Sequence, residues 1–178
     1  LEAAGCTMGS NGFYERDGQT VGFVLSVGAG DQVRVDLAQA AAQQLKEVGI
    51  DCTVEIPVQP DWAGQMAYLI GWGSPFDADD HTYKVFGTNK GANYSSYSNP
   101  QVDRYLTKAR QSDDPNVRAK AYAQFQIELA KDPAFALICY VDADYVADAA
   151  LQGICADTVM GHHGVGIFWN VAEWTFSE

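Results

Sequence analysis

The sequence lacks the features that mark several large classes of protein. Its 178 residues contain no run of 18 apolar residues, so no segment predicts a membrane-spanning helix. Lysine and arginine number only 11 against 23 acidic residues, and a net charge of −12 argues against nucleic acid as a partner. Because 47% of the residues are apolar and 19% are charged, the chain is expected to fold around one sizeable core.

Catalytic and cofactor-binding signatures are also missing. The sequence has no Gly-x-Ser-x-Gly elbow and no His-Glu-x-x-His pair. Gly28-Ala29-Gly30 follows a predicted strand and opens a helix, but Val33 stands where a dinucleotide site carries its third glycine. We therefore predict that the protein is not an enzyme and that it uses no cofactor.

Cysteine is scarce and shows no metal-binding spacing. The four cysteines are Cys6, Cys52, Cys139 and Cys155, and none forms a Cys-x-x-Cys pair. Cys155 lies sixteen positions after Cys139, which ends an apolar run, so a disulfide between these two could close a loop in an oxidising compartment. Buried free thiols are the alternative, because reduced cysteine packs as a small apolar residue.

The first part of the chain predicts a β-α-β unit. Residues 20–27 alternate between apolar and polar side chains, as in a strand, and Asp31 then occupies the expected N-cap of a helix that ends at Gly49. Residues 50–58 alternate again. Two strands joined by a helix in this way are expected to be parallel, with a right-handed crossover.

The rest of the sequence predicts further strands and helices around this unit. The apolar run 66–72 is expected to be a buried central strand, and a helix follows from Asp77 to Phe86. Asn99-Pro100 and Asp114-Pro115 each predict the start of a helix, and together they predict a helical hairpin. Residues 135–141 and 167–171 are expected to be strands. The fold class is therefore α/β, with a mixed sheet flanked by helices.

The stretch 68–79 is the best candidate for a binding site. It runs from an apolar strand through Trp72, which stands between two glycines, into the acidic start of a helix at Asp77 and Asp79. An exposed aromatic face beside carboxylates suits a polar, often cationic, organic ligand. The same carboxylates and His81 could hold a divalent ion, but helix capping explains them without one, and we predict no metal site.

Set in order, several segments resemble the family 5 extracellular solute-binding proteins of peptide and nickel importers. The resemblance covers nearly the whole chain. It is carried by Leu1-Glu2-Ala3-Ala4-Gly5 with Asp17-Gly18 and the strand after it, the junction 45–51, Leu69-Ile70-Gly71-Trp72, Asn93-Tyr94, the segment 97–103, and the helix from Asp114-Pro115 to Asp132-Pro133.

The resemblance implies that residues 1–178 form a single lobe of a periplasmic-binding-protein-like fold. It implies a fragment of a longer chain, in which the last predicted strand near 167–174 packs toward an absent lobe. The implied function is that of a substrate-binding component of an ABC importer, which captures a peptide-like or other small polar solute. The implied partner is a membrane permease, and the implied location is periplasmic or extracellular, free or anchored through an absent N-terminus.

Four residues are expected to contact the ligand: Trp72 and Tyr94, which lie in the matched segments, and Asp77 and Asp79, which could meet a positive group. In peptide-binding members of the family, an aspartate three residues after the tryptophan holds the α-amino group of the peptide. Here that position is Pro75, and Asp77 lies five residues after Trp72, so its assignment rests on its chemistry. Two alternatives stay open at this point: a carboxylate-dependent hydrolase and a non-catalytic interaction domain.

Overall fold

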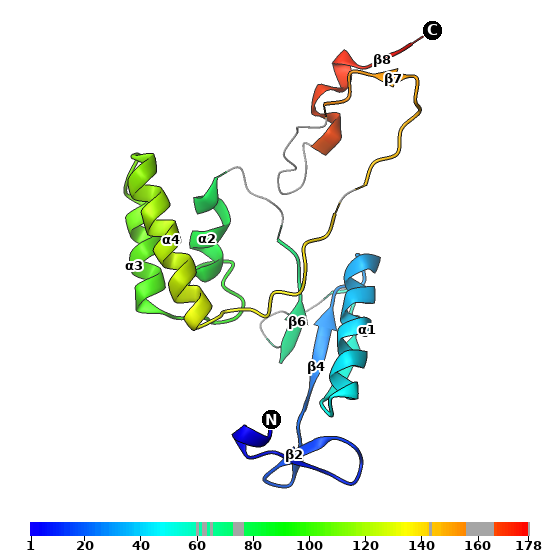
Figure 1. The fold of residues 1–178 in the computed structure, drawn as a ribbon, viewed down its shortest axis with the longest axis vertical. Helices are drawn as coiled ribbons and strands as arrows, with labels where there is room; N and C mark the ends of the chain where they lie inside the picture. The colour runs from blue at the N-terminus through cyan, green and yellow to red at the C-terminus, as the bar shows by residue number, and fades with distance from the viewer. Residues whose placement is uncertain are drawn as a thin grey trace. The chain divides into compact units, whose positions relative to one another are not determined.

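The chain folds into two compact units, which are described separately below. Unit 1 comprises Leu1–Gly71 and unit 2 comprises Trp72–Glu178. The expected α/β class is confirmed, because both strands and helices are present (Figure 1). The structure is a computed structural model, and it describes residues 1–59, 61, 64, 66–72, 77–142, 144–155 and 166–177.

Unit 1 contains the predicted β-α-β unit. Strand β4 (Gly22–Val27) pairs in parallel with β5 (Asp51–Glu55), and helix α1 (Gln32–Glu47) connects them. A third strand, β6 (Ala67–Leu69), pairs in parallel with the other side of β4. The sheet order is thus β5-β4-β6, and the prediction that the run 66–72 is the central strand is wrong. The apolar pattern of the run does not reflect full burial, since Met66 is 75% exposed and only Leu69 of β6 is buried.

The core of unit 1 forms where α1 covers this sheet. Ala38 and Ala42 are buried on α1, and their small side chains let the helix lie close to the strands. On the strands, Val27 and Cys52 have no exposed surface. Asp31 caps α1 as expected, since its side chain accepts a hydrogen bond from the Arg34 amide at 3.1 Å. The buried members of this core are Leu25, Val27, Val35, Ala38, Ala42, Cys52 and Leu69.

A small antiparallel sheet precedes β4. Its strands are β1 (Thr7–Met8), β2 (Tyr14–Arg16) and β3 (Gln19–Thr20), and a short 3-10 helix, η1 (Glu2–Ala4), precedes them. The predicted turn at Asp17-Gly18 is confirmed, and both residues have positive φ values of 52° and 75°. Two left-handed residues in a row are what a two-residue hairpin turn requires.

Unit 2 is built mainly from three helices that begin where the sequence predicted. Each starts at a side-chain cap: α2 at Asp77, α3 at Asn99 and α4 at Asp114, and proline opens both α3 and α4. The helical hairpin is confirmed by the close packing of α3 against α4. The bounds are Ala78–Phe86 for α2, Pro100–Arg110 for α3 and Pro115–Lys131 for α4.

The two strands predicted near the C-terminus are not formed in the described part of the chain. Residues 135–141 have no strand, and 167–171 lie in the 3-10 helix η2 (Gly166–Glu173). The Asn170 side chain holds η2 locally, since its Nδ2 donates to the Gly153 carbonyl at 2.8 Å and its Oδ1 accepts from Trp174 Nε1 at 2.9 Å. The antiparallel pair that does form is β7 (Leu151–Gln152) with β8 (Thr175–Phe176).

No helix within the described residues is long and apolar enough to cross a membrane.

The core of unit 2 provides a test of the fold. Leu106 is 1% exposed and packs with Val102 and Phe125 between α3 and α4. Leu106→Ala in the full-length protein should lower the free energy of unfolding by about 2 to 5 kcal/mol, because the deleted methyl groups leave a cavity. Chemical denaturation followed by helical circular dichroism measures the change. Ile127→Ala, at a half-exposed position of α4, is the control, and an equal loss in both variants would contradict the assigned core.

Candidate functional site

Trp72 lies in a cluster of aromatic side chains within unit 2. The Tyr94 ring stacks on it at a centroid distance of 6.2 Å and an interplanar angle of 12°. The His81 ring lies 5.6 Å from Trp72 at 52°. Trp72 and Tyr94 remain 37% and 42% exposed, whereas His81 is buried. We call these three residues the aromatic cluster, and it offers solvent a large aromatic surface backed by an imidazole.

Tyr94 is placed by a hydrogen-bonded loop between α2 and α3. The neighbouring Asn93 donates through Nδ2 to the carbonyls of Gly87 and Tyr97, at 2.9 and 2.7 Å, and its Oδ1 accepts from the Tyr97 amide at 3.0 Å. At the start of the loop, Asp103 accepts from both the amide and the hydroxyl of Thr88. These contacts hold the loop against α3, so the position of the Tyr94 ring does not depend on its stacking alone.

Asp77, the first of the two candidate carboxylates, has two structural partners. It caps α2 by accepting from the Asp79 amide at 2.8 Å, and both of its oxygens accept from Arg118 Nη2 at 2.7 Å. The bond from the Asp79 amide and then the Arg118 guanidinium hold the pKa of the Asp77 carboxyl below its ordinary value. Asp77 is therefore ionised, and the positive charge of Arg118 balances it, while 60% of its side chain stays exposed.

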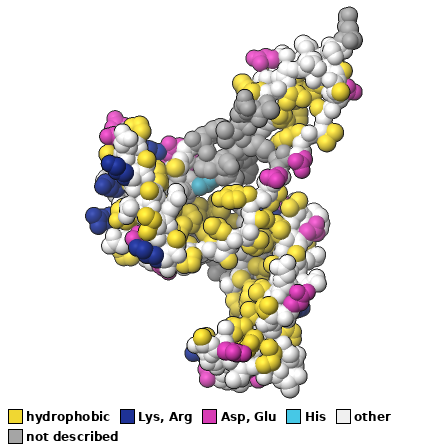
Figure 2. All heavy atoms as spheres, viewed as in Figure 1, with side chains coloured by type: hydrophobic (Ala, Val, Ile, Leu, Met, Phe, Trp, Pro, Cys, Tyr) yellow, Lys and Arg dark blue, Asp and Glu magenta, His cyan; other side chains and the backbone are white. Residues whose placement is uncertain are grey.

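Asp79, the second carboxylate, is bound in the same way by another arginine. Arg110 donates to its Oδ2 through Nε at 2.9 Å and through Nη2 at 2.7 Å, and only 20% of the Asp79 side chain is exposed. The Arg110 guanidinium also lies 3.8 Å from the centroid of the Tyr83 ring. These pairs tie α2 to α3 and α4. Figure 2 shows most of the visible Lys and Arg side chains over the helices of unit 2.

Sequence reasoning missed the two arginines. They lie 31 and 41 residues after the aspartates that they bind, so no local spacing relates them. The only available signal was the position of Arg110 at the end of one predicted helix and of Arg118 at the start of the next. A helical hairpin brings such positions together.

The structure makes no metal centre from these carboxylates. Within the described residues, no group of three or more His, Cys, Asp or Glu side chains is arranged to hold a metal ion. Residues 73–76, which complete the predicted Gly-Trp-Gly turn, lie outside the described residues.

The expected disulfide is absent among the described cysteines. Cys139 is a free, exposed cysteine, so the predicted disulfide between Cys139 and Cys155 is not formed in the structure. Cys6 and Cys52 are buried free thiols, and burial raises the pKa of the Cys52 thiol. These two residues follow the alternative in which cysteine packs as an apolar side chain.

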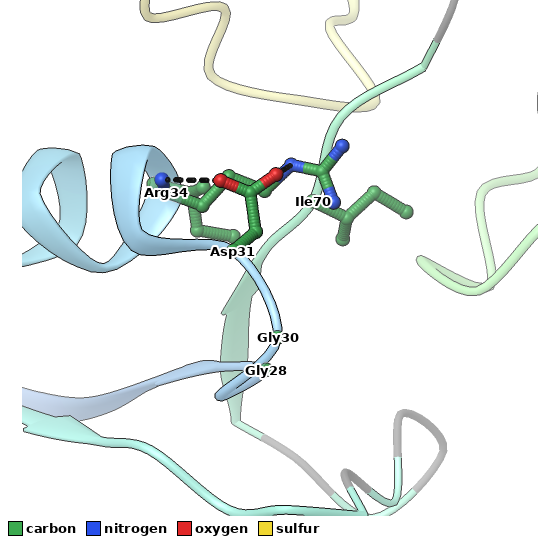
Figure 3. Close-up of a pocket in the computed structure, with 6 residues that line it drawn as sticks. Gly28, Gly30, Asp31, Arg34 and Ile70 are labelled. Carbon is green, nitrogen blue, oxygen red and sulfur yellow. Dashed lines mark hydrogen bonds and ion pairs between the residues drawn. The ribbon is translucent and has the colours of Figure 1, made fainter. Parts of the chain in front are cut away.

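Unit 1 holds a cavity of about 330 Å³ at the carboxyl ends of β4 and β6. Figure 3 shows the Arg34 guanidinium reaching past Asp31 toward Ile70, with Gly28 and Gly30 on the loop beside them. Arg34 Nε lies 3.4 Å from Asp31 Oδ2, and both side chains are about 40% exposed. The carboxyl ends of parallel strands are where α/β sheets commonly bind ligands. The lining residues are Gly28, Gly30, Asp31, Arg34, Leu69 and Ile70.

Gly71 makes room for the arginine of this cavity. A Cβ atom at this position would lie 2.7 Å from Arg34 Nη2, closer than real carbon atoms approach. The Gly28-Ala29-Gly30 turn, which the sequence analysis compared with a dinucleotide site, lies at the same cavity. The Asp31 carboxylate stands beside the Arg34 guanidinium, so the two charges at this end of the cavity balance each other.

Comparison with known proteins places this fold. No protein-family model matches the sequence. Protein XP55 of Streptomyces lividans is 37% identical over 161 residues, which is 86% of this chain and 30% of the relative. The crystal structure of NikZ from Campylobacter jejuni in complex with Ni(L-His) matches with a TM-score of 0.83 and 33% identity, over 98% of this chain and 37% of that one.

A third relative agrees with these two. Oligopeptide-binding protein AppA of Bacillus subtilis is 25% identical over 179 residues, covering 94% of this chain and 32% of the relative. Its structure in complex with a nonapeptide has a TM-score of 0.70 to this chain. The chain spans about a third of the length of each relative.

The fold is thus that of an α/β part of a solute-binding protein. Its structural neighbours are proteins of extracellular solute-binding protein family 5, the family that the sequence resembles.

The loop that carries Tyr94 yields a prediction. Asn93→Ala removes the bonds to Gly87 and Tyr97, so the Trp72–Tyr94 stack should be lost and stability should fall by about 1 to 3 kcal/mol. Fluorine NMR of the full-length protein with 5-fluorotryptophan reports the Trp72 ring, and Trp72→Phe assigns its signal. Ser95→Ala is the control, because Ser95 makes one exposed bond to Asn93 at 3.3 Å. A Trp72 signal unchanged in Asn93→Ala would refute the positioning role.

The cap of α2 yields a second prediction. The folded pKa of Asp77 is below its ordinary value of 3.8. Its contribution to stability is therefore complete above 3.8 and is lost as the pH falls through the folded pKa. Carbon-13 NMR titration of the carboxyl should give a midpoint below 3.8. Asp77→Asn keeps an oxygen that can cap the helix but has no carboxyl group to titrate. The loss of stability that Asp77 causes at low pH should therefore be absent in this variant. A midpoint at or above 3.8 would contradict the Arg118 pairing.

Proposed function

We propose that the chain is part of the substrate-binding component of an ABC importer. In this role the full-length protein captures a small polar solute outside the cytoplasmic membrane and delivers it to a membrane permease. The observation that carries the proposal is the 33% identity and TM-score of 0.83 to NikZ over nearly all of this chain. Family membership alone does not identify the solute, because one fold serves many ligands.

The aromatic cluster is proposed as the wall that the solute contacts from unit 2. The Trp72 ring is held by its neighbours and still reaches solvent, so it can bind a ligand without a large loss of side-chain entropy. Tyr94 extends the same surface and adds a phenolic hydroxyl. Two ordered aromatic rings favour an organic solute with apolar or planar groups over a simple ion.

Asp77 and Asp79 remain proposed ligand contacts, and their arginine partners limit what they can bind. A cationic group would share these carboxylates with Arg118 or Arg110, whereas a neutral solute meets two ion pairs whose charges are already balanced. Asp77 is the more accessible of the two, because three times as much of its side chain is exposed. It is therefore the better candidate for an ammonium group of the ligand.

The proposed solute is peptide-like or another small polar molecule. The two structures that match nearly the whole chain contain Ni(L-His) in NikZ and a nonapeptide in AppA. Both ligands carry amino-acid groups, which an aromatic wall and a carboxylate can contact. Because this chain covers about a third of such proteins, the remaining walls of the site would come from the rest of the polypeptide, and binding would close the lobes around the solute.

The structure gives no support to the hydrolase alternative. A general acid needs a raised pKa, whereas the pKa of the Asp77 carboxyl is lowered and both carboxylates are bound by arginines. The other alternative, a plain interaction domain, predicts that Trp72 is fully buried. The ring is 37% exposed. We therefore infer a binding protein without catalytic chemistry.

Native mass spectrometry of the gently purified full-length protein tests this function. The expected result is a small adduct that is released on denaturation and whose mass identifies the solute. Trp72→Ala should lose the adduct with little change in thermal stability, because the side chain is partly exposed. Trp72→Phe keeps an aromatic ring and should retain part of the binding. Full retention of the adduct by Trp72→Ala would overturn the assignment of the wall.

A further inference from the structure

His81 is the buried member of the aromatic cluster. It is 7% exposed, whereas the rings of Trp72 and Tyr94 both remain partly exposed. The His81 ring lies 5.6 Å from the Trp72 ring at an angle of 52°, which is within the range over which aromatic rings attract one another. His81 therefore connects the indole ring of Trp72 to the packed interior of unit 2.

The backbone next to Trp72 does little to fix the position of its ring. In the sequence Trp72 stands between Gly71 and Gly73, and glycine allows more backbone conformations than any other residue. The preceding strand β6 ends at Leu69, and the following helix α2 begins only at Ala78. The orientation of the indole ring must therefore come from side-chain contacts.

Helix α2 is a fixed support for His81. The two ion pairs described above tie the first turn of α2 to α3 and α4. His81 lies directly after this turn, and Val85, four residues later on the same face, is 1% exposed. His81 Nε2 also lies 3.8 Å from Asp80 Oδ2, and Asp80 accepts a hydrogen bond from Lys84 at 2.9 Å. The His81 ring is thus restrained both by burial and by its neighbours on the helix.

We propose that His81 is a positioning residue for solute binding, which transmits the fixed place of α2 to the Trp72 ring. Tyr94 stacks on the indole ring from its loop, and His81 supports the same ring from the helix. A ring that is already ordered loses less entropy when a solute binds to it. The ion pairs of Asp77 and Asp79 then serve binding indirectly, because they fix the helix that carries His81.

Only one step of this proposal rests on the proposed function, namely the step from an ordered Trp72 ring to a bound solute. The support of Trp72 by His81 is a property of the folded protein and can be measured without any solute. The two parts are therefore tested by separate measurements.

Fluorine NMR of the full-length protein labelled with 5-fluorotryptophan tests the support, and Trp72→Phe assigns the Trp72 signal. His81→Leu keeps an apolar side chain at the buried position but removes the ring, so the Trp72 signal should shift and broaden. His81→Phe restores an aromatic ring and should return a single narrow signal. An unchanged Trp72 signal in His81→Leu, or an equally broad signal in His81→Phe, would overturn the proposal.

Val85→Ala is the matched control that separates positioning from stability. It removes buried methyl groups from the same face of α2, so it should lower the melting temperature of the full-length protein while leaving the Trp72 signal narrow. If Val85→Ala broadens the Trp72 signal as much as His81→Leu does, the role of His81 is only structural and the proposal is wrong.

Native mass spectrometry of the same variants tests the step to binding. The fraction of protein that carries the co-purified adduct should fall on the order of 10-fold in His81→Leu, as expected for the loss of one aromatic contact, and should recover in His81→Phe. Full retention of the adduct in His81→Leu would overturn the positioning role. If the unchanged protein itself carries no adduct, the result counts against the proposed function, and the NMR comparison still decides whether His81 orients Trp72.

Discussion

The parallel pairing of β4 with strands on both of its sides is the constraint on which unit 1 depends. Parallel neighbours cannot be joined by a tight turn, so the chain must cross over through α1 and later return in β6. That arrangement places the carboxyl ends of β4 and β6 at the same edge of the sheet. The cavity with Arg34 lies at this edge, and Gly71 leaves room for the guanidinium.

In unit 2, the comparable constraint is the pairing of carboxylates on one helix with arginines on two others. Asp77 and Asp79 lie at the start of α2, the helix that carries His81 of the aromatic cluster, and Arg118 and Arg110 set their geometry. The acidic residues that suggest a cationic ligand therefore also connect α2 to α3 and α4 through ion pairs. A ligand that contacts these carboxylates would share them with the arginines, because a carboxylate accepts about four hydrogen bonds.

The aromatic cluster is a partly exposed apolar surface whose side chains are nevertheless held in place. Trp72 and Tyr94 are partly exposed but ordered by stacking and by the loop around Asn93, as a ligand-binding surface should be. Such an ordered surface suits a small solute that binds and dissociates reversibly.

The sequence by itself determined those elements whose signals are local. The caps at Asp31, Asn99 and Asp114, the turn at Asp17-Gly18 and the crossover of the β-α-β unit depend on neighbours within a few residues, and all are present. Only the tertiary structure decided which strand is central, whether 135–141 forms a ladder and which arginines hold Asp77 and Asp79. These outcomes depend on groups distant in the chain. The hydrophobic pattern and the capping residues indicate local burial and local hydrogen bonds. They do not identify the strand or side chain, distant in the sequence, with which a segment pairs.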